Sequence, residues 1–336
     1  MITRTLQQRI EGNLFKGKAV IVIGARQVGK STLFRQITEK LEEPVLMLNC
    51  DEPEVRELLV GMNLVELKLM IGKHRVVVID EAQRVSEIGM TLKRITDNFP
   101  EVQLLVTGSS SFELQNRLNE PLTGRKYEYR LFPISTRELL EHGGLMAVKQ
   151  SLESRLIYGS YPDIINHTDE AKELLMNIAG SYLYKDLLAL EDIRRPALLE
   201  KCYIVFRLGA FSRNLRTELK KSKKIYFYDN GIRNAVIQNF APLSMRNDAG
   251  ALWENFFISE RIKANEYEGR YAKSYFWRTT QQQEIDYIEE SDGQFAVFEM
   301  KWNPRKKTTP LPAAFLKTYP VAQEAVVTPE NYLEWL

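Results

Sequence analysis

One short stretch near the N-terminus constrains the fold of this 336-residue chain more than any other: KAVIVIGARQVGKST, residues 18–32. The apolar, β-branched run KAVIVIG predicts a buried strand, and the residues from Lys30 to about Leu41 predict a helix. Between them, GARQVGKST fits the pattern G-x-x-x-x-G-K-[ST], whose glycines let backbone N–H groups wrap a phosphate at the start of a helix. The stretch therefore predicts a strand, a phosphate-binding loop and a helix, in that order.

The residue types in this loop predict a nucleotide site with a bound metal. We expect Lys30 to bridge the β- and γ-phosphates and the hydroxyl of Ser31 to bind Mg²⁺. The alternative is a plain glycine turn, but the position of the motif between a buried strand and a helix favours the phosphate site. The whole predicted phosphate loop comprises Gly24, Ala25, Arg26, Gln27, Val28, Gly29, Lys30, Ser31 and Thr32.

Two further strand ends carry polar residues that complete such a site. VVVIDEAQ is an apolar strand that ends in Asp80 and Glu81, and two adjacent acids there are unfavourable unless cations or polarised water meet them. We expect Asp80 to hold the metal and its water shell, and Glu81 to activate the attacking water. LLVTGSS ends another strand, where Thr107 or Ser109 is a candidate partner of the γ-phosphate or the water, with a simple small-residue turn as the alternative.

The nucleotide is expected to be ATP, because no guanine-reading N-K-x-D motif stands at a suitable place in the chain. Phosphoryl transfer also uses an arginine to neutralise charge in the transition state. Our first candidate is Arg125, in LTGRKYEYRLFPIS, and Arg26 in the loop is the second. A structural salt bridge is the alternative for either arginine.

Strand and helix patterns alternate through the first part of the chain, which predicts an α/β fold with a parallel sheet covered by helices. The pattern is helical from about Thr136 to Glu200, and short aromatic and β-branched strands follow from Ile225 onward. We therefore predict three parts: a P-loop domain over residues 1–138, a helical connector over 139–200 and a second α/β domain over 201–336.

Composition excludes several classes of protein. No apolar run approaches the roughly 20 residues that cross a bilayer, and the first residues lack the apolar centre of a secretion signal. Two cysteines, Cys50 and Cys202, cannot make a disulfide framework, which fits a reducing cytoplasm. The three histidines lack the spacing of metal ligands, so no zinc site is expected at His74, His142 or His167.

Together these motifs resemble a known family: bacterial and archaeal AAA-superfamily ATPases with a C-terminal domain related to the restriction-endonuclease fold. The motifs that carry the resemblance are GARQVGKSTL, VVVIDEAQR, LLVTGSSSFEL, LTGRKYEYRLFPIS, GSYPDII, YLYKDLLALEDI, KIYFYDNGIRNAV, GALWENFFISE, FWRTTQQQEIDYI and FEMK. The resemblance implies ATP and Mg²⁺ at residues 24–32, with Asp80 and Glu81 in the second motif. It covers nearly the whole chain.

The chain departs from this family in one segment. Members carry a winged-helix-like module of roughly 50–60 residues before the K-x-Y-F-Y-D strand, whereas EDIRRPALLEKCYIVFRLGAFSRNL here passes almost directly to it. Because winged helices place a helix in the DNA major groove, the missing segment weakens the case for sequence-specific DNA binding.

The C-terminal part contains a second acidic set. In EIDYIEESDGQFAVFEMK, Asp286 and the Glu299-x-Lys301 triplet lie on two strands that a Ser-Asp-Gly turn could join as a hairpin. Glu254, in the preceding helix, matches the helical glutamate of the nuclease superfamily that the resemblance implies. The three acids could hold Mg²⁺, with Lys301 orienting a hydrolytic water or stabilising developing charge. The alternative is an inherited fold whose polar residues now serve packing and ion pairs.

Residues 194–224 are strongly basic. They contain ten lysines and arginines against two glutamates, so the stretch carries a net charge of +8. Such a stretch could grip nucleic acid through phosphate contacts, or it could be a solvated loop.

Three functions remain open at this point. The first is a cytoplasmic Mg²⁺-dependent ATPase coupled to a nuclease-like domain. The second is an ATP-regulated DNA nuclease that uses the acidic set. The third is a switch that binds ATP without hydrolysing it and recruits a partner. The oligomeric state stays open in all three.

Overall fold

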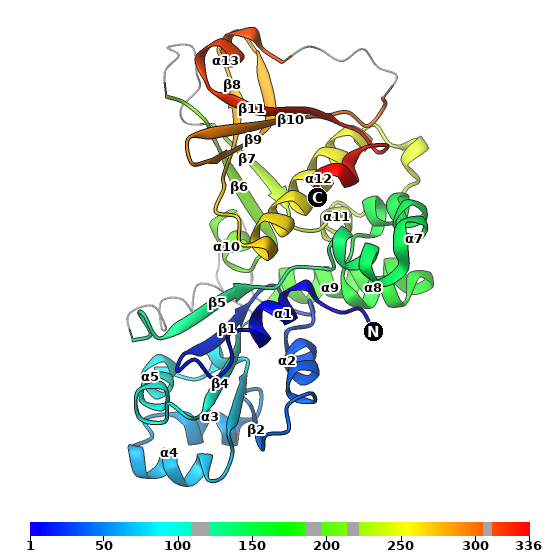
Figure 1. Ribbon diagram of the computed structural model, residues 1–336. Coiled ribbons are helices and arrows are strands. Elements are labelled where there is room, and N and C mark those ends of the chain that lie inside the picture. Colours follow the sequence, from blue (N-terminus) through cyan, green and yellow to red (C-terminus); the bar gives the residue numbers. More distant parts are fainter. Residues whose placement is uncertain (109–120, 186–195, 214–221, 305–310) are drawn as a thin grey trace. The chain divides into compact units, whose positions relative to one another are not determined.

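A computed structural model of the chain describes residues 1–108, 121–185, 196–213, 222–304 and 311–336 (Figure 1). The chain divides into two compact units. The first holds residues 1–132 and 201–203, and the second holds residues 133–200 and 204–336. The helices that we predicted as a separate connector therefore belong to the same unit as the C-terminal sheet, and the predicted domain boundaries stay predictions.

The first unit alternates strands and helices, as the sequence pattern predicts. Its elements are α1 (Thr5–Glu11), β1 (Ala19–Ile23), α2 (Lys30–Thr38), β2 (Val45–Asn49), α3 (Pro53–Leu59), α4 (Leu64–Ile71), β3 (Val76–Asp80), the 3₁₀ turn η1 (Ala82–Arg84), α5 (Ile88–Asn98), β4 (Gln103–Gly108) and β5 (Lys126–Arg130). The strands form one sheet in the order β2-β3-β4-β1-β5, and every pair is parallel. Helices α3 and α4, which we did not predict, connect β2 to β3.

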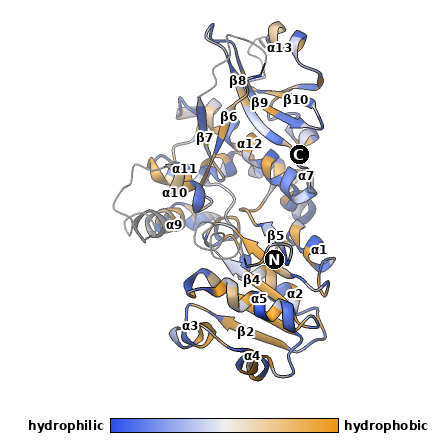
Figure 2. Ribbon diagram, turned by 90° about the vertical axis from the view of Figure 1, so that its left-hand side faces the viewer, coloured by the Kyte–Doolittle hydropathy of each residue, from blue (hydrophilic) through white to orange (hydrophobic). Residues whose placement is uncertain are grey.

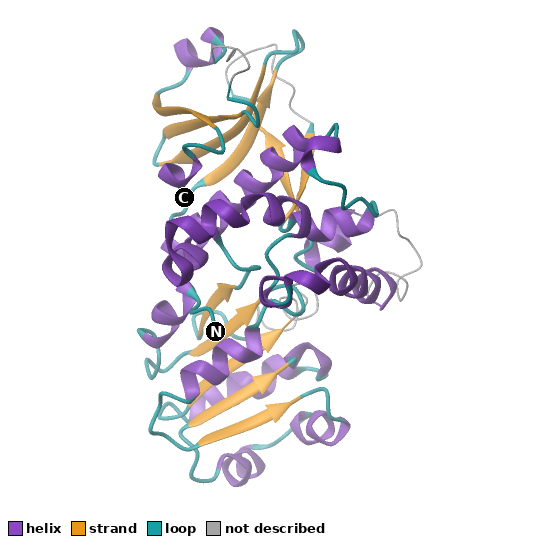
Figure 3. Cartoon of the chain, turned by 90° about the vertical axis from the view of Figure 1, so that its right-hand side faces the viewer, coloured by secondary structure: helices purple, strands orange, loops and turns teal. Residues whose placement is uncertain are grey.

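The core of the first unit lies along its central strands. Every residue of β1 and β4 is buried, and each of these strands runs between two neighbours in the sheet. Figure 2 shows hydrophobic colour along β2, and Figure 3 shows these strands as one twisted sheet with helices packed beside it. A buried parallel sheet of this kind places the ends of its strands, and the loops that follow them, along one edge.

The second unit combines helices with a mixed sheet. Its elements are α7 (Thr136–Tyr158), α8 (Pro162–Asn166), η2 (Thr168–Glu170), α9 (Ala171–Lys185), α10 (Pro196–Lys201), β6 (Val205–Ala210), β7 (Lys223–Phe227), α11 (Asn230–Val236), η3 (Leu243–Met245), α12 (Ala249–Glu268), β8 (Lys273–Arg278), β9 (Glu284–Ser291), β10 (Gln294–Met300), α13 (Ala313–Thr318), β11 (Val321–Val327) and η4 (Tyr332–Trp335). The sheet order is β11-β10-β9-β8-β6-β7, with both parallel and antiparallel pairs. The predicted fold class, a parallel-sheet domain followed by a second α/β domain, is confirmed at this level.

The predicted hairpin is present in the second unit. Strands β9 and β10 pair antiparallel, with Gln294 opposite Ser291. The two residues between them, Asp292 and Gly293, both have positive φ, at 51° and 78°. Two positive φ values are the signature of the tight turn that Asp-Gly favours. The strands bury one aromatic core, formed by Phe211, Trp277, Ile285, Ile288, Phe295, Val297, Phe315 and Tyr319.

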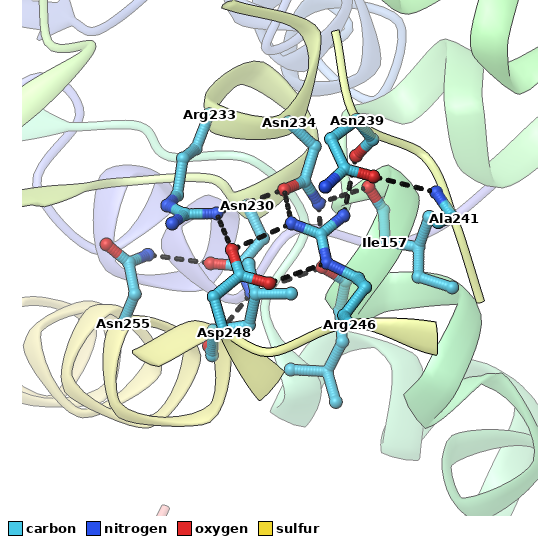
Figure 4. Close-up of polar contacts among 11 residues, drawn as sticks. Ile157, Asn230, Arg233, Asn234, Asn239, Ala241, Arg246, Asp248 and Asn255 are labelled. Carbon is cyan, nitrogen blue, oxygen red and sulfur yellow. Dashed lines mark hydrogen bonds and ion pairs between the residues drawn. The ribbon is translucent and has the colours of Figure 1, made fainter. Parts of the chain in front are cut away.

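A buried polar network joins α7, α11 and α12, and it explains why the DNGIRNAV sequence is needed here (Figure 4). Asn234 is fully buried and donates to the carbonyls of Leu156 and Ile157 at 3.1 and 2.7 Å, so it satisfies the end of α7. Its own oxygen accepts from Arg246 at 3.0 Å, and Arg246 also binds Asp248. The network fixes the three helices against one another with side chains instead of backbone pairing.

Asp229 makes a second buried contact set beside this network. Its carboxylate accepts from the backbone N–H of Ser160 at 2.7 Å and of Ile232 at 3.2 Å. The chain comes so close that a Cβ atom on Gly159 would lie 1.9 Å from the Asp229 carboxylate, and Gly159 has a φ of +75°. Only glycine fits there.

Within the described residues, none of the helices combines the length and apolar character needed to cross a membrane.

Candidate functional site

The predicted phosphate loop follows β1 directly and ends where α2 begins. Gly24 has a φ of +157°, and a Cβ atom there would lie 2.1 Å from the carbonyl oxygen of Leu131. Gly29 has a φ of +94° and stands immediately before α2. Both glycines are therefore required by backbone geometry, and the loop presents its N–H groups at a helix N-terminus.

Lys30 is almost fully buried, with 4% of its surface exposed. Its ammonium donates to the carbonyl oxygens of Gly24 at 3.1 Å and of Ala25 at 2.8 Å. Burial lowers the pKa of Lys30 to about 8, while the charges of Glu81 and Asp80 act in the opposite direction. A buried cation whose partners are neutral carbonyls gains a stronger partner when an anionic phosphate arrives.

The acids at the end of β3 are held by a threonine from β4. The fully buried Thr107 hydroxyl donates to the carboxylate of Asp80, and it accepts from the backbone N–H of Glu81 at 3.0 Å. That N–H also donates to Oδ1 of Asp80 at 3.2 Å. Glu81 itself has a φ of 53°, and its carboxylate accepts from the side chain of Gln83. The hydroxyl thus fixes the positions of both acids.

The sheet order explains why these residues meet. Strand β4 lies between β1 and β3, so the end of β4 stands between the phosphate loop and the two acids. The structure brings Lys30, Thr107, Asp80 and Glu81 together at one edge of the sheet. Ser31 is exposed beside Lys30. A hydroxyl and a carboxylate are oxygen donors that suit Mg²⁺, so Ser31 and Asp80 fit the metal that accompanies ATP.

Arg125 is not brought to this site. Its backbone carbonyl pairs with the N–H of Ala19, at the start of β1, whereas the loop begins at Gly24 after the end of that strand. Five residues of strand separate the two points, which is about 16 Å. The guanidinium instead forms an ion pair with Asp97 at 2.5 Å. The pairing of β5 with β1 therefore corrects the expectation that Arg125 contacts the phosphates bound by its own chain.

Arg26 stays closer to the nucleotide site. It lies half-buried within the loop. Burial is the main cause of the lowered pKa of Lys30, and the positive charge of Arg26 lowers it further, whereas Glu81 and Asp80 act in the opposite direction. Ser109, the other candidate at the end of β4, lies outside the described residues.

The second predicted set also converges, in the second unit. Glu254 comes from α12, Asp286 from β9 and Glu299 from β10. Burial, together with the charge of Glu299, raises the pKa of Asp286 to about 6, and Asp286 accepts from the backbone N–H of Met300 at 3.0 Å. Burial and the charge of Asp286 likewise raise the pKa of Glu254. The charge of Glu299 therefore acts on Asp286, and the charge of Asp286 acts on Glu254.

Two lysines form ion pairs with these acids, and a tyrosine donates a hydrogen bond to one of them. Lys224 binds Glu254 at 3.1 Å and Glu284 at 2.5 Å, and the hydroxyl of Tyr226 donates to Glu254. Lys301 binds Glu299 at 3.2 Å. Sequence reasoning missed Lys224 and Tyr226, although their alternation on one strand places them on the same face of β7. Across the described part of the chain, no three His, Cys, Asp or Glu side chains are arranged to hold a metal ion.

The basic stretch at 194–224 is only partly described, since Arg194, Arg195, Arg216, Lys220 and Lys221 fall outside the described residues. Several described members bind acids within the chain. Arg207 forms an ion pair with Glu200, and Arg213 binds both carboxylate oxygens of Glu290 at 2.8 and 2.9 Å. With Lys224 also paired, part of the predicted charge is neutralised internally.

In a comparison with known protein families, one family model matches most of the first unit. Residues 16–140 match the AAA domain. The first unit contains an AAA-type P-loop domain. Residues 196–243 and 249–336 match two domains of unknown function, DUF8612 and DUF4143. Because those descriptions name no activity, the restriction-endonuclease-like interpretation of the second unit stays a proposal.

Curated relatives match the chain in sequence at low identity. An uncharacterized protein of Mycobacterium tuberculosis is 24% identical over 366 residues, which cover 98% of this chain and 80% of that protein. An uncharacterized protein of Haemophilus influenzae is 25% identical over 271 residues, covering 74% and 63%. Domain III of the replication initiation protein DnaA from Thermotoga maritima is 15% identical with a TM-score of 0.34, covering 56% of this chain and 90% of that chain. No conclusion about fold follows from so low a score.

Proposed function

We propose that this protein is a Mg²⁺-dependent ATPase, in which residues 24–32 hold the phosphates and Asp80 and Glu81 carry out the hydrolytic step. One observation supports this most strongly: the Thr107 hydroxyl fixes Asp80 and Glu81 beside a buried Lys30 that binds only backbone carbonyls of its loop. The arrangement supplies a cation, a metal-binding carboxylate and a second carboxylate at one sheet edge.

Each residue has a distinct task in this proposal. Lys30 leaves the carbonyls of its loop and donates to the β- and γ-phosphates. Ser31 and Asp80 would hold Mg²⁺, which supplies charge neutralisation when it is bound. Glu81 accepts a proton from the attacking water, as a carboxylate held in a fixed backbone geometry can do. Thr107 positions both acids and touches neither phosphate nor water.

Two substitutions test these roles in the purified full chain. Lys30→Ala should abolish binding of a fluorescent ATP analogue, because no other buried cation of the loop replaces it. Glu81→Gln should keep ATP binding but stop phosphate release. Glu87→Gln, at an exposed position six residues further on, is a matched control that should leave both unchanged. Normal phosphate release from Glu81→Gln would remove Glu81 from the mechanism, and tight ATP binding without any release from the wild type would favour the switch function instead.

A second candidate function, an ATP-regulated DNA nuclease, is supported by the convergence of Glu254, Asp286 and Glu299 from three elements. The paired lysines argue against a metal in the present arrangement, because Lys224 and Lys301 already neutralise two of these acids. Plasmid cleavage with Mg²⁺ or Mn²⁺, lost in Asp286→Ala, would support the nuclease. Absence of cleavage across metals and DNA substrates, in protein that hydrolyses ATP, would exclude it while leaving the ATPase intact.

A further inference from the structure

A buried arginine at the start of helix α1 contacts the phosphate loop. Arg4 directly precedes this helix, and only 5% of its surface is exposed. Its Nη1 atom donates to the carbonyl oxygen of Val28 at 2.7 Å, and its Nη2 atom donates to the carbonyl oxygen of Phe132 at 2.6 Å. One guanidinium group therefore joins the phosphate loop, which contains Val28, to the chain just after β5.

Helix α1 is itself fixed to the sheet of the first unit. Its apolar residues Leu6 and Ile10 are buried. Just beyond its end, the side-chain amide of Asn13 donates to the hydroxyl of Tyr129, in β5, at 2.7 Å. The backbone of Arg4 therefore has a defined position relative to β5, and its side chain starts from a fixed point.

The carbonyl of Phe132 is fixed to the same sheet. Leu131, the residue before it, donates its backbone N–H to the carbonyl of Ile23 at 2.8 Å, which continues the pairing of β5 with β1. A guanidinium group is planar and rigid, so its two donors reach their two carbonyls in a set geometry. Arg4 therefore fixes the position of Val28 relative to the central sheet.

The bond to Val28 also sets the direction of the next backbone N–H. The peptide bond between Val28 and Gly29 is trans, so its C=O and N–H groups point in opposite directions. The Gly29 N–H therefore points away from Arg4, and within the described residues it has no hydrogen-bond acceptor. Gly29 is the N-cap of α2, and the N–H groups at a helix start are those that bind phosphate.

We infer that Arg4 is a positioning residue of the nucleotide site, holding the Val28–Gly29 peptide so that the Gly29 N–H donates to a phosphate of the nucleotide. This inference rests on the proposed ATP site, and Arg4 itself touches no part of the nucleotide. Without the guanidinium group the peptide can rotate, and the phosphate loses a donor. Because the loop wraps the α- and β-phosphates, which ATP and ADP share, the affinity for both nucleotides depends on Arg4.

Titration of the purified full chain with fluorescent ATP and ADP analogues tests the inference. Arg4→Met keeps an unbranched side chain and removes both donors. It should weaken the binding of ATP and of ADP about tenfold each, the order of one hydrogen bond to a charged group. The rate constant for hydrolysis at saturating ATP should fall by less than about threefold. An arginine that only stabilised the fold would lower the fraction of chains that bind and leave the dissociation constant of the others unchanged.

Two further variants complete the test. Arg35→Met makes the same substitution at an exposed arginine of α2, and as the matched control it should leave both affinities unchanged. Arg4→Lys keeps the charge, but its single nitrogen cannot take the places of both Nη1 and Nη2. It should therefore weaken both nucleotides by a smaller factor than Arg4→Met does. Thermal melting of each variant shows whether folding is unchanged.

The outcomes separate this inference from the proposed function. Wild-type affinity in a folded Arg4→Met, in a protein whose Lys30→Ala variant no longer binds ATP, would overturn the inference and leave the ATP site in place. A lower rate at saturating ATP with unchanged affinity would overturn it as well. Should Arg4→Met fail to fold, wild-type affinity in Arg4→Lys decides against it in the same way. Absence of ATP binding by the wild type would overturn both the inference and the proposed function.

Discussion

Replacing Thr107 by valine isolates the hydroxyl that organises the nucleotide site. Valine keeps the branched shape of the side chain, which is fully buried at the end of β4. The change removes the bond to the Asp80 carboxylate and the acceptor for the Glu81 N–H. The Glu81 N–H keeps Asp80 as a partner at 3.2 Å, so the net loss is close to one charge-assisted hydrogen bond.

The size of the effect follows from that loss. A hydrogen bond to a charged group contributes about 1.5–3 kcal/mol, and each 1.36 kcal/mol changes a rate by tenfold. We therefore expect Thr107→Val to lower the rate constant for hydrolysis by about ten- to a hundredfold. The affinity for ATP should change by less than about threefold, because Lys30 and the phosphate loop are untouched.

Phosphate release at saturating ATP measures the first quantity, and titration with a fluorescent ATP analogue measures the second. Thr107→Ser keeps the hydroxyl and is the matched control, so it should retain most of the wild-type rate. Wild-type hydrolysis in Thr107→Val would refute the reasoning. Equal losses in the serine and valine variants would also refute it, because they would point to packing and not to the hydroxyl.

Two further predictions concern the folding of the second unit. Gly159→Ala should lower the free energy of unfolding by at least about 2 kcal/mol, because its Cβ atom would meet Asp229 at 1.9 Å; Gly144→Ala, with the same φ of +75° but nothing within 4 Å, should lose much less in the same urea titration. Asp248→Asn should also destabilise this unit at pH 7, since hydrogen bonds from Arg246 hold the pKa of Asp248 down to about 2. The ionised form is the stabilising one, so the difference from the wild type should be constant above pH 4 and shrink as the pH falls from 4 to 2. A difference that stays constant to pH 2 in thermal melts would contradict this account.

The strand, the glycine loop and the helix over residues 19–38 could be predicted from the sequence because their geometry is local. A strand, a glycine loop and a helix follow one another without a gap, and Asp80 and Glu81 directly end an apolar strand. Parallel pairing then brings strand ends to one edge, so Thr107 could be placed near them from the pattern alone.

The failures share a different physical origin. Whether Arg125 stands near the phosphates depends on the pairing of β5 with β1, which no local pattern encodes. The role of Lys224 depends on the packing of β7 against α12, two elements that are separated in the chain by α11. Strand β6 was missed because CYIVFRLGAF lies between charged segments and was interpreted as part of a connection.

The hydrogen bonds that Lys30 makes within its own loop have a consequence for the protein without nucleotide. The carbonyl oxygens of Gly24 and Ala25 act as stand-ins for phosphate oxygens, so the core is never left with a bare ammonium ion. A shortage of ATP should therefore leave the fold intact, and the phosphate loop should keep its shape until the next ATP molecule binds.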